Sequence, residues 1–106
     1  MLIFEMVQIS MMTQQYNCSF VQEILGAGGQ LIDVRSPVEF NQGSLSGAVN
    51  MPIESFQYLM DGIDSSKPVL LYCRTGARSG MVKNYLDQMG FSQVHNIGGI
   101  RQFVGC

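Results

Sequence analysis

The stretch VLLYCRTGARSG, residues 69–80, decides how the rest of the sequence is interpreted. Residues 69–72 form an uninterrupted apolar run, which is typical of a strand buried on both faces of a sheet. Cys73 follows this run directly, and a helix is predicted to begin near Arg78 or Ser79. The stretch therefore predicts a strand, a short loop and a helix, with a thiol where the strand ends.

The predicted loop has the composition of an anion-binding site. Loop N–H groups and the positive end of a helix dipole both favour a negative charge, and Arg74 and Arg78 add two of the chain's six cations. A cysteine in an apolar strand is usually a small core residue, but a core position needs no glycine–arginine loop beside it. We therefore predict that Cys73 has a lowered pKa and is a nucleophile. The residues predicted to bind its substrate are Arg74, Thr75, Gly76, Ala77, Arg78 and Ser79.

The remaining sequence alternates short apolar strands with helices. We predict strands at 31–34 and 94–97, a helical turn at 39–41, and helices at 19–25, at 56–62 and from the loop to residue 89. This alternation favours an α/β fold with a parallel sheet covered on both faces. No repeat or linker divides the chain, so residues 1–106 are taken as one domain, with 1–18 as an extension or an edge strand.

Three charged residues near the first strand are predicted to support the site without taking part in the reaction. Asp33 and Arg35 flank Val34 on a strand, so both side chains point to the same side of it. Glu39 comes within reach of Arg35 if a turn follows. We expect a salt bridge or loop brace among these residues, with Asp33 supporting the active-site loop.

Composition excludes several other classes of function. The chain has six Lys and Arg against eight Asp and Glu, which makes it a poor general binder of nucleic acid. No apolar run is long enough to predict a membrane span, and three cysteines with one histidine predict neither a disulfide framework nor a metal site. No secretory signal is recognised at residues 1–9, so we expect a reducing cytoplasm, in which Cys18 and Cys106 are ordinary thiols.

Three segments together make the sequence resemble the rhodanese family of sulfurtransferases. Residues 31–35 followed by Glu39 and Phe40 are similar to the family's Asp-Val-Arg…Glu-Phe/Tyr signature, and residues 43–52 to its Gly-His-Ile-x-Gly-Ala-x-Asn-Ile-Pro box. Residues 73–79 are similar to its active-site loop, and Gly98-Gly99 to its usual Gly-Gly pair. The chain departs from the family at Ser44, where His is common, and at Phe103, where Trp is frequent.

The resemblance implies a rhodanese-like fold of about five parallel strands, no cofactor, and a two-step reaction. Cys73 takes a sulfur atom from an anionic donor such as thiosulfate, and the resulting persulfide passes it to cyanide, a thiol or a sulfur-accepting protein. Two alternatives stay open. A phosphatase or arsenate reductase needs Cys-x₅-Arg, whereas Arg78 follows Cys73 at the shorter Cys-x₄-Arg spacing. A non-catalytic binding module would not need the thiol and its two arginines.

Overall fold

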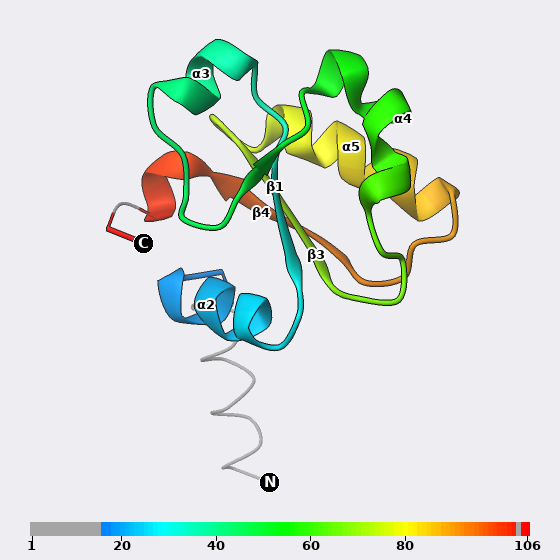
Figure 1. The fold of residues 1–106 in the computed structure, drawn as a ribbon, viewed down its shortest axis with the longest axis horizontal. Coiled ribbons are helices and arrows are strands. Elements are labelled where there is room, and N and C mark those ends of the chain that lie inside the picture. The colour runs from blue at the N-terminus through cyan, green and yellow to red at the C-terminus, as the bar shows by residue number, and fades with distance from the viewer. Residues whose placement is uncertain (1–15, 104) are drawn as a thin grey trace, which may run out of the picture.

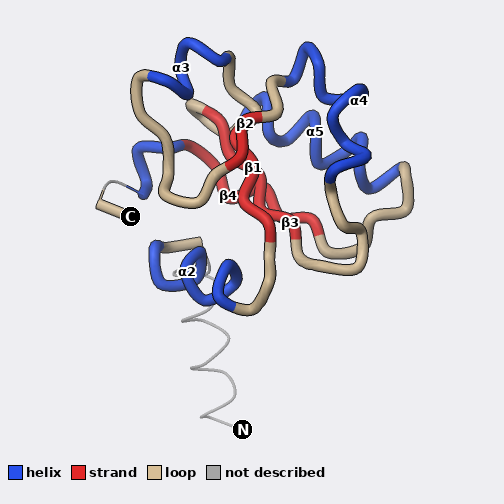
Figure 2. The backbone as a smooth tube through the Cα atoms, viewed as in Figure 1, coloured by secondary structure: helices blue, strands red, loops and turns tan. Residues whose placement is uncertain are grey.

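A computed structural model of the chain describes residues 16–103 and 105–106. Its strands are β1 (Gln30–Asp33), β2 (Val49–Asn50), β3 (Val69–Cys73) and β4 (Val94–Gly99). They form one parallel sheet in the order β2-β1-β3-β4, with β1 and β3 at its centre (Figures 1 and 2). The predicted parallel sheet is confirmed, with four strands in the described residues where about five were expected.

Helices cover both faces of the sheet, as predicted (Figure 1). One face is covered by α2 (Cys18–Gly26) and the 3₁₀ helix η3 (Ile100–Phe103), and the other by α4 (Phe56–Leu59) and α5 (Ala77–Gln88). The connection from β1 to β2 contains α3 (Pro37–Asn41). Two 3₁₀ helices, η1 (Ile53–Ser55) and η2 (Met60–Gly62), flank α4.

The five residues of β3 are all buried, and they alternate between the two faces. Leu70 and Tyr72 pack with α2 and η3, whereas Val69, Leu71 and Cys73 pack with α4 and α5. Side chains from both faces of β3 are buried, each set in a different hydrophobic core, so the strand has no alternating polar positions. The alternation also places the Cys73 side chain on the face that α5 covers.

Two details of the helices differ from the predictions. In the sequence, Ser19 followed by Gln22 resembles a capping box, but the residue that caps α2 is Asn17, whose side-chain oxygen accepts the N–H of Phe20 at 2.9 Å. Val82, Tyr85, Leu86 and Met89 repeat at the spacing of an amphipathic helix, which predicts that all four are buried. In α5, Val82 and Leu86 are buried, whereas Tyr85 and Met89 are exposed. A helix lying on a sheet buries only a narrow stripe, so the outer members of such a pattern can face solvent.

Cys18 and Cys106 form a disulfide, which corrects the expectation that both are ordinary thiols. The two residues are 88 positions apart, and neither lies in a spacing pattern that predicts pairing. Their proximity arises from the fold, because α2 and the C-terminal turn pack on the same face of the sheet. Cys73 is therefore the free cysteine of the chain.

The expected extension or edge strand over residues 1–18 lies outside the described residues, apart from its last three positions. Residues 16 and 17 lead into α2, which begins at Cys18. Within the described part of the chain, no helix is long and apolar enough to cross a membrane.

Candidate active site

Cys73 is the last residue of β3, at the carboxyl edge of the parallel sheet. Ligands of open α/β sheets bind beyond this edge, because the loops and helix N-termini gather there. The Cys73 side chain is completely buried, as that of an ordinary core cysteine would be. The polar groups that surround its sulfur distinguish it from a core residue.

The loop after Cys73 is tight, and two glycines allow it to be so. Gly76 precedes α5 in the left-handed region, with a φ of 99°, and a side chain there would lie 3.3 Å from the Cα atom of Gly98. A Cβ atom at Gly99 would lie 2.6 Å from the carbonyl oxygen of Arg74. Because β4 runs this close to the loop, larger residues at these positions would push the loop out of place.

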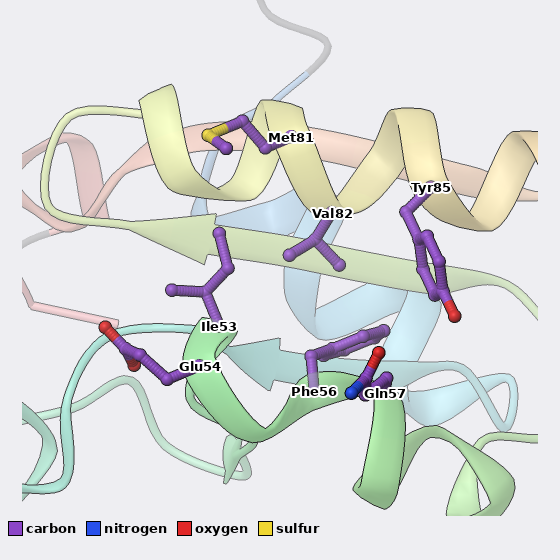
Figure 3. A pocket seen from close by; sticks show the side chains of 7 residues that line it. All are labelled: Ile53, Glu54, Phe56, Gln57, Met81, Val82 and Tyr85. Carbon is purple, nitrogen blue, oxygen red and sulfur yellow. The ribbon is translucent and has the colours of Figure 1, made fainter.

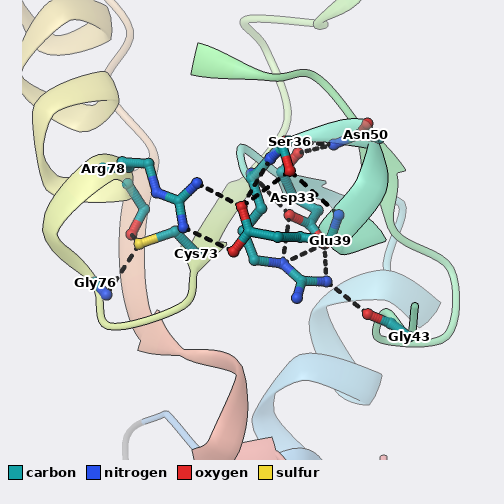
Figure 4. Close-up of polar contacts among 10 residues, drawn as sticks. Asp33, Ser36, Glu39, Gly43, Asn50, Cys73, Gly76 and Arg78 are labelled. Atoms are coloured by element: carbon teal, nitrogen blue, oxygen red, sulfur yellow. Dashed lines mark hydrogen bonds and ion pairs between the residues drawn. The ribbon is translucent and has the colours of Figure 1, made fainter. Parts of the chain in front are cut away.

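The loop directs N–H groups at the sulfur of Cys73. The backbone N–H of Gly76 donates to Sγ at 3.0 Å (Figure 4). The Ser79 hydroxyl lies 3.4 Å from Sγ. Burial raises the pKa of the Cys73 thiol, but hydrogen bonds from the Ser79 side chain and from the backbone N–H groups of residues 75, 76 and 79 outweigh it. The pKa therefore lies below its ordinary value, as predicted, and the site favours the thiolate.

A second polar contact controls the direction of the Ser79 hydroxyl. Its oxygen lies 2.7 Å from Oδ1 of Asn96, which also accepts the N–H of Gly98 at 3.0 Å. The amide nitrogen of Asn96 donates to the carbonyl oxygen of Gly76 at 3.0 Å. Asn96 thus joins β4 both to the active-site loop and to the hydroxyl beside the sulfur, at a point where the β3–β4 register shifts.

Arg78 lies in the first turn of α5, where it pairs with Glu39 of α3. Its two terminal nitrogens donate to the two carboxylate oxygens at 2.7 and 3.0 Å (Figure 4). Hydrogen bonding to Arg78 is the main reason that the pKa of Glu39 falls to about 2. The same bonds are the main reason that the pKa of Arg78 is raised, and the charge of Cys73 adds a smaller contribution.

The predicted salt bridge between Asp33 and Arg35 is confirmed. Arg35 Nη2 lies 2.7 Å from Asp33 Oδ2 and donates to the carbonyl oxygen of Gly43 at 2.6 Å. Asn50 reinforces this brace by donating to the backbone oxygens of both residues. The expected partners differ in one respect: Glu39 pairs with Arg78 and not with Arg35. The link from this region to the active-site loop therefore runs through Glu39, and not through Asp33.

Two cavities flank the site, with volumes of about 260 and 320 Å³. We call the smaller one the arginine pocket, and its lining residues are Arg35, Glu39, Gln42, Gly43, Arg74, Ile100 and Arg101. The larger one is an apolar groove between η1, α4 and α5, lined by Ile53, Glu54, Phe56, Gln57, Met81, Val82 and Tyr85 (Figure 3). The arginine pocket has the positive charge that an anionic substrate requires, and the groove does not. Among residues 16–103 and 105–106, no three His, Cys, Asp or Glu side chains form a cluster that could hold a metal ion.

Sequence reasoning missed Asn96 and Arg101. Asn96 is a polar residue inside a short apolar strand and next to the Gly98-Gly99 pair, and that position was the available signal. Arg101 gives no such signal, because it lies 27 positions after Arg74 and reaches the same pocket only in the folded chain. Cys73 and its loop could be found because they are continuous in the sequence.

The rhodanese-like domain family model matches residues 18–106. The chain belongs to the rhodanese-like domain family. The match begins at Cys18, the first residue of α2, and includes β1, β2, β3 and β4. It leaves residues 1–17 outside the family match.

Three relatives illustrate the range of this rhodanese-like family. The uncharacterized protein YqhL of Bacillus subtilis is 39% identical over 72% of this chain, and the match spans 61% of YqhL, which is less than two thirds of its length. Thiosulfate sulfurtransferase PspE of Escherichia coli is 35% identical over 66% of this chain and 69% of its own. A solved structure described as rhodanese with anions from E. coli is 32% identical, covers 72% of this chain and 92% of its own, and has a TM-score of 0.64.

Proposed function

We propose that this chain is a sulfurtransferase that moves a sulfane sulfur from an anionic donor such as thiosulfate to a thiol or cyanide, through a persulfide on Cys73. The observation that carries this proposal is the surrounding of Cys73. Its sulfur is a free thiol at the carboxyl edge of the sheet, within 3.0 Å of one N–H donor and 3.4 Å of a hydroxyl. Relatives that are named sulfurtransferases support the same chemistry.

In the first step, the Cys73 thiolate attacks the outer sulfur of thiosulfate. A bond forms between the two sulfurs, the sulfur–sulfur bond of thiosulfate breaks, and its electron pair leaves with sulfite. In the second step, cyanide or a thiolate attacks the outer sulfur of the persulfide, and the electron pair returns to Cys73. Neither step needs an external oxidant, because the attacking sulfur or cyanide carries the electron pair that forms the new bond. The hydrogen bonds to Cys73 favour its thiolate, which is the attacking form in the first step.

The loop would stabilise the charge that moves between these two steps. Its N–H groups face the sulfur, and fixed donors in a buried site stabilise a developing anion as an oxyanion hole does. Arg74 is exposed at the start of the loop and can meet the donor directly. Arg78 adds its positive charge, although Glu39 takes two of its five N–H donors.

The small donors and acceptors named here, together with a sulfur-accepting protein, are the proposed partners. A cytoplasmic location stays a prediction. Disulfides such as that of Cys18 and Cys106 are typical of oxidising compartments, so the redox state of these two residues in the cell tests that prediction.

The decisive experiment is the intact mass of the protein after incubation with thiosulfate. The wild-type chain should gain one sulfur atom, which dithiothreitol removes. Cys73→Ser should gain none, whereas the double variant Cys18→Ser/Cys106→Ser should gain one as the wild type does. Sulfur uptake by Cys73→Ser, or none by the double variant, contradicts the assignment.

The same samples separate the alternatives. Hydrolysis of aryl phosphates at ordinary enzymatic rates would favour a phosphatase, and the absence of both activities would favour a binding module. We expect no phosphatase activity, because the six-residue loop from Cys73 to Arg78 is one residue shorter than Cys-x₅-Arg chemistry requires.

A further inference from the structure

No residue that lines the apolar groove between η1, α4 and α5 takes part in the two steps proposed above. Met81 and Tyr85 line this groove and leave 64% and 38% of their surfaces exposed (Figure 3). Phe56 and Val82 form its buried floor, and the ring of Phe56 meets that of Tyr85 edge to face, with centroids 6.5 Å apart. Exposed apolar side chains around a concave surface are typical of a site that another molecule covers.

The groove begins about one helical turn from the reactive sulfur. Ser79, whose hydroxyl lies 3.4 Å from Sγ of Cys73, precedes Val82 by three positions on α5. At a rise of about 1.5 Å per residue, three positions correspond to about 4.5 Å along the helix. Val82 and Phe56 also pack in the same hydrophobic core as Cys73. A molecule lying along α5 can therefore reach the groove and the carboxyl edge of β3 together.

The end of the groove nearest the active site carries negative charge. Figure 3 shows Glu54 at the end toward which β3 runs and Tyr85 at the other end. Glu54 is exposed, and among residues 16–103 and 105–106 it has no Lys or Arg within 4.0 Å. The pKa of Arg78 is raised mainly by its bonds to Glu39, and the charge of Glu54 adds a smaller contribution. Because Glu39 already pairs with Arg78, the carboxylate of Glu54 is left to attract a cation.

These features fit a polypeptide segment better than a small ion. Thiosulfate and cyanide have no apolar surface to bury, and they carry the same sign of charge as Glu54. A helical peptide presents side chains three and four positions apart on one face, about 5–6 Å from each other, which matches the distance of one turn along α5. Its apolar side chain can enter a groove between helices, and the flexible thioether of Met81 can adapt to that side chain.

We propose that the apolar groove docks a helical segment of a protein that accepts sulfur from Cys73. The segment places an apolar side chain in the groove, a Lys or Arg beside Glu54, and its accepting cysteine one turn away. This inference rests on the proposed sulfur transfer and names how a protein acceptor is recognised. The acceptor cysteine loses its proton to solvent, and its thiolate attacks the outer sulfur of the persulfide. A sulfur–sulfur bond forms on the acceptor, the bond to Cys73 breaks, and its electron pair returns to Cys73.

Binding is tested without the reaction. The probe is a synthetic peptide amide of about 15 residues, which is long enough to form a helix. It carries Ser in place of the accepting cysteine, Lys three positions later and Leu four positions later, and it is titrated into the Cys73→Ser protein by calorimetry. Gln in place of the Leu or of the Lys keeps a similar helix propensity and should weaken binding at least about threefold. Equal binding of the three peptides, or no binding of any, overturns the proposal.

Two pairs of matched variants test whether the peptide binds in the groove. Met81→Ala and Met89→Ala each shorten an exposed methionine, but only Met81 lines the groove. Glu54→Gln and Glu23→Gln each remove an exposed carboxylate, and Glu23 lies in α2 on the other face of the sheet. Met81→Ala and Glu54→Gln should each weaken binding of the Leu peptide at least about threefold, whereas the two controls should not. Equal effects within either pair contradict the proposal.

A kinetic arm separates this proposal from the proposed function. Cys73 persulfide is formed with thiosulfate and mixed with the cysteine form of the Leu peptide, with its Gln counterpart, or with cyanide as a check that the persulfide reacts. Transfer to the Leu peptide should be at least about threefold faster than to the Gln peptide, and Met81→Ala should reduce this preference. Failure to form the persulfide contradicts the sulfurtransferase assignment, whereas a persulfide that reacts equally with both peptides contradicts only the docking.

The oligomeric state provides the last test of what covers the groove. The wild type and Met81→Ala are compared by sedimentation equilibrium, and we expect the same mass for both. A wild-type dimer that Met81→Ala separates into monomers would show that a second copy of the chain covers the groove, and it would overturn the proposal.

Discussion

The hydroxyl of Ser79 has one proton and two neighbours that can accept it. Asn96 Oδ1 can only accept, so at 2.7 Å the hydroxyl donates to it, and a protonated Cys73 can then donate its own proton to Ser79. When Cys73 ionises, the same hydroxyl can turn to the sulfur, since Asn96 Oδ1 still accepts the N–H of Gly98. Both protonation states of Cys73 are therefore satisfied without moving the backbone.

This arrangement predicts the effect of Ser79→Ala. The variant removes the side-chain hydrogen bond that lowers the pKa of Cys73, so that pKa should rise and the thiolate fraction at neutral pH should fall. Persulfide formation at pH 7 should slow about tenfold, the factor that one hydrogen bond of ~1.4 kcal/mol to a charged group provides. The pH dependence of alkylation by iodoacetamide measures the pKa directly.

Thr75→Ala is the matched control for this prediction. Its side chain contacts the N–H of Ala77 and not the sulfur, and its backbone N–H is kept. The pH profile of Thr75→Ala should match that of the wild type. An unshifted profile in Ser79→Ala would remove Ser79 from the control of this thiol.

At this scale, the sequence predicts the residues that are neighbours along the chain. Cys73, its lowered pKa and the N–H groups around it follow from seven consecutive positions and the chemistry of a strand-to-helix loop. Asn96 lies in β4 and Arg101 in η3, and no local sequence pattern predicts that either residue lies near the loop after Cys73. Their roles depend on the parallel register of β3 and β4, which only the folded chain provides.

Between elements, Glu39 connects α3 with α5. Its Oε1 accepts the backbone N–H and the hydroxyl of Ser36, which caps α3, and the same carboxylate holds Arg78. The Glu39 side chain thus helps to cap the start of α3 and also positions Arg78 in the first turn of α5. The active-site loop lies directly before α5, so the Glu39–Arg78 pair fixes the helix end of this loop, while Asn96 of β4 contacts the loop at Gly76.

This connection predicts an acid-sensitive contribution to stability. Hydrogen bonds lower the pKa of Glu39 from 4.5 to about 2, so the contribution is present above pH 4.5 and lost as the pH falls toward 2. The free energy of unfolding of Glu39→Gln, measured by urea denaturation, should be lower than that of the wild type at pH 6. The difference should shrink steadily between pH 5 and pH 2.

Asp87→Asn serves as a comparison, since its partner Lys83 is exposed on the outer face of α5. Exposed pairs of this kind contribute about 0.2–1 kcal/mol, so this variant should change stability less than Glu39→Gln at pH 6. A Glu39→Gln difference that stays constant down to pH 2 would show that the carboxylate charge does not carry the connection.

The cores of the helices and strands could be predicted from local sequence, whereas several of their boundaries depend on tertiary packing. The strand at 69–72 could be predicted because it is an uninterrupted apolar run, and the helix after the loop could be predicted because its apolar residues repeat at helical spacing. The predicted helix at 56–62 divides into α4 and η2. The predicted strand at 94–97 extends to Gly99, where the backbone lies against the active-site loop. Strand propensity disfavours glycine, so the local sequence does not place Gly98 and Gly99 in a strand. They belong to β4 because two backbones approach closely there, which depends on the tertiary structure.

For the whole molecule, the disulfide predicts a large effect on stability and none on chemistry. Closing a loop of 88 residues should stabilise the folded chain by about 2–4 kcal/mol, mainly by restricting the unfolded state. Cys18→Ser/Cys106→Ser should lose that amount in urea denaturation. Its sulfur uptake at Cys73 should match the wild type, since the disulfide packs with α2 and η3 on the opposite face of the sheet.

A reducing agent provides an independent measurement of the same effect. Dithiothreitol should lower the unfolding midpoint of the wild type to that of the double variant and leave the double variant unchanged. A wild-type midpoint that does not respond to full reduction would contradict the predicted contribution of the disulfide.

The Cα atoms of Cys18 and Cys106 are 5.5 Å apart, so the two ends of the rhodanese-like unit, residues 18–106, lie next to each other. A unit of this geometry can be spliced into a surface loop of a host protein through two adjacent junctions, without stretching either partner. The same geometry favours circular permutation, in which a few linker residues join residue 106 to residue 18 and the new termini lie in the exposed turn at 64–67. Because both junctions lie at the disulfide and away from the carboxyl end of β3, the active-site loop and Cys73 should keep their surroundings in such a chimera.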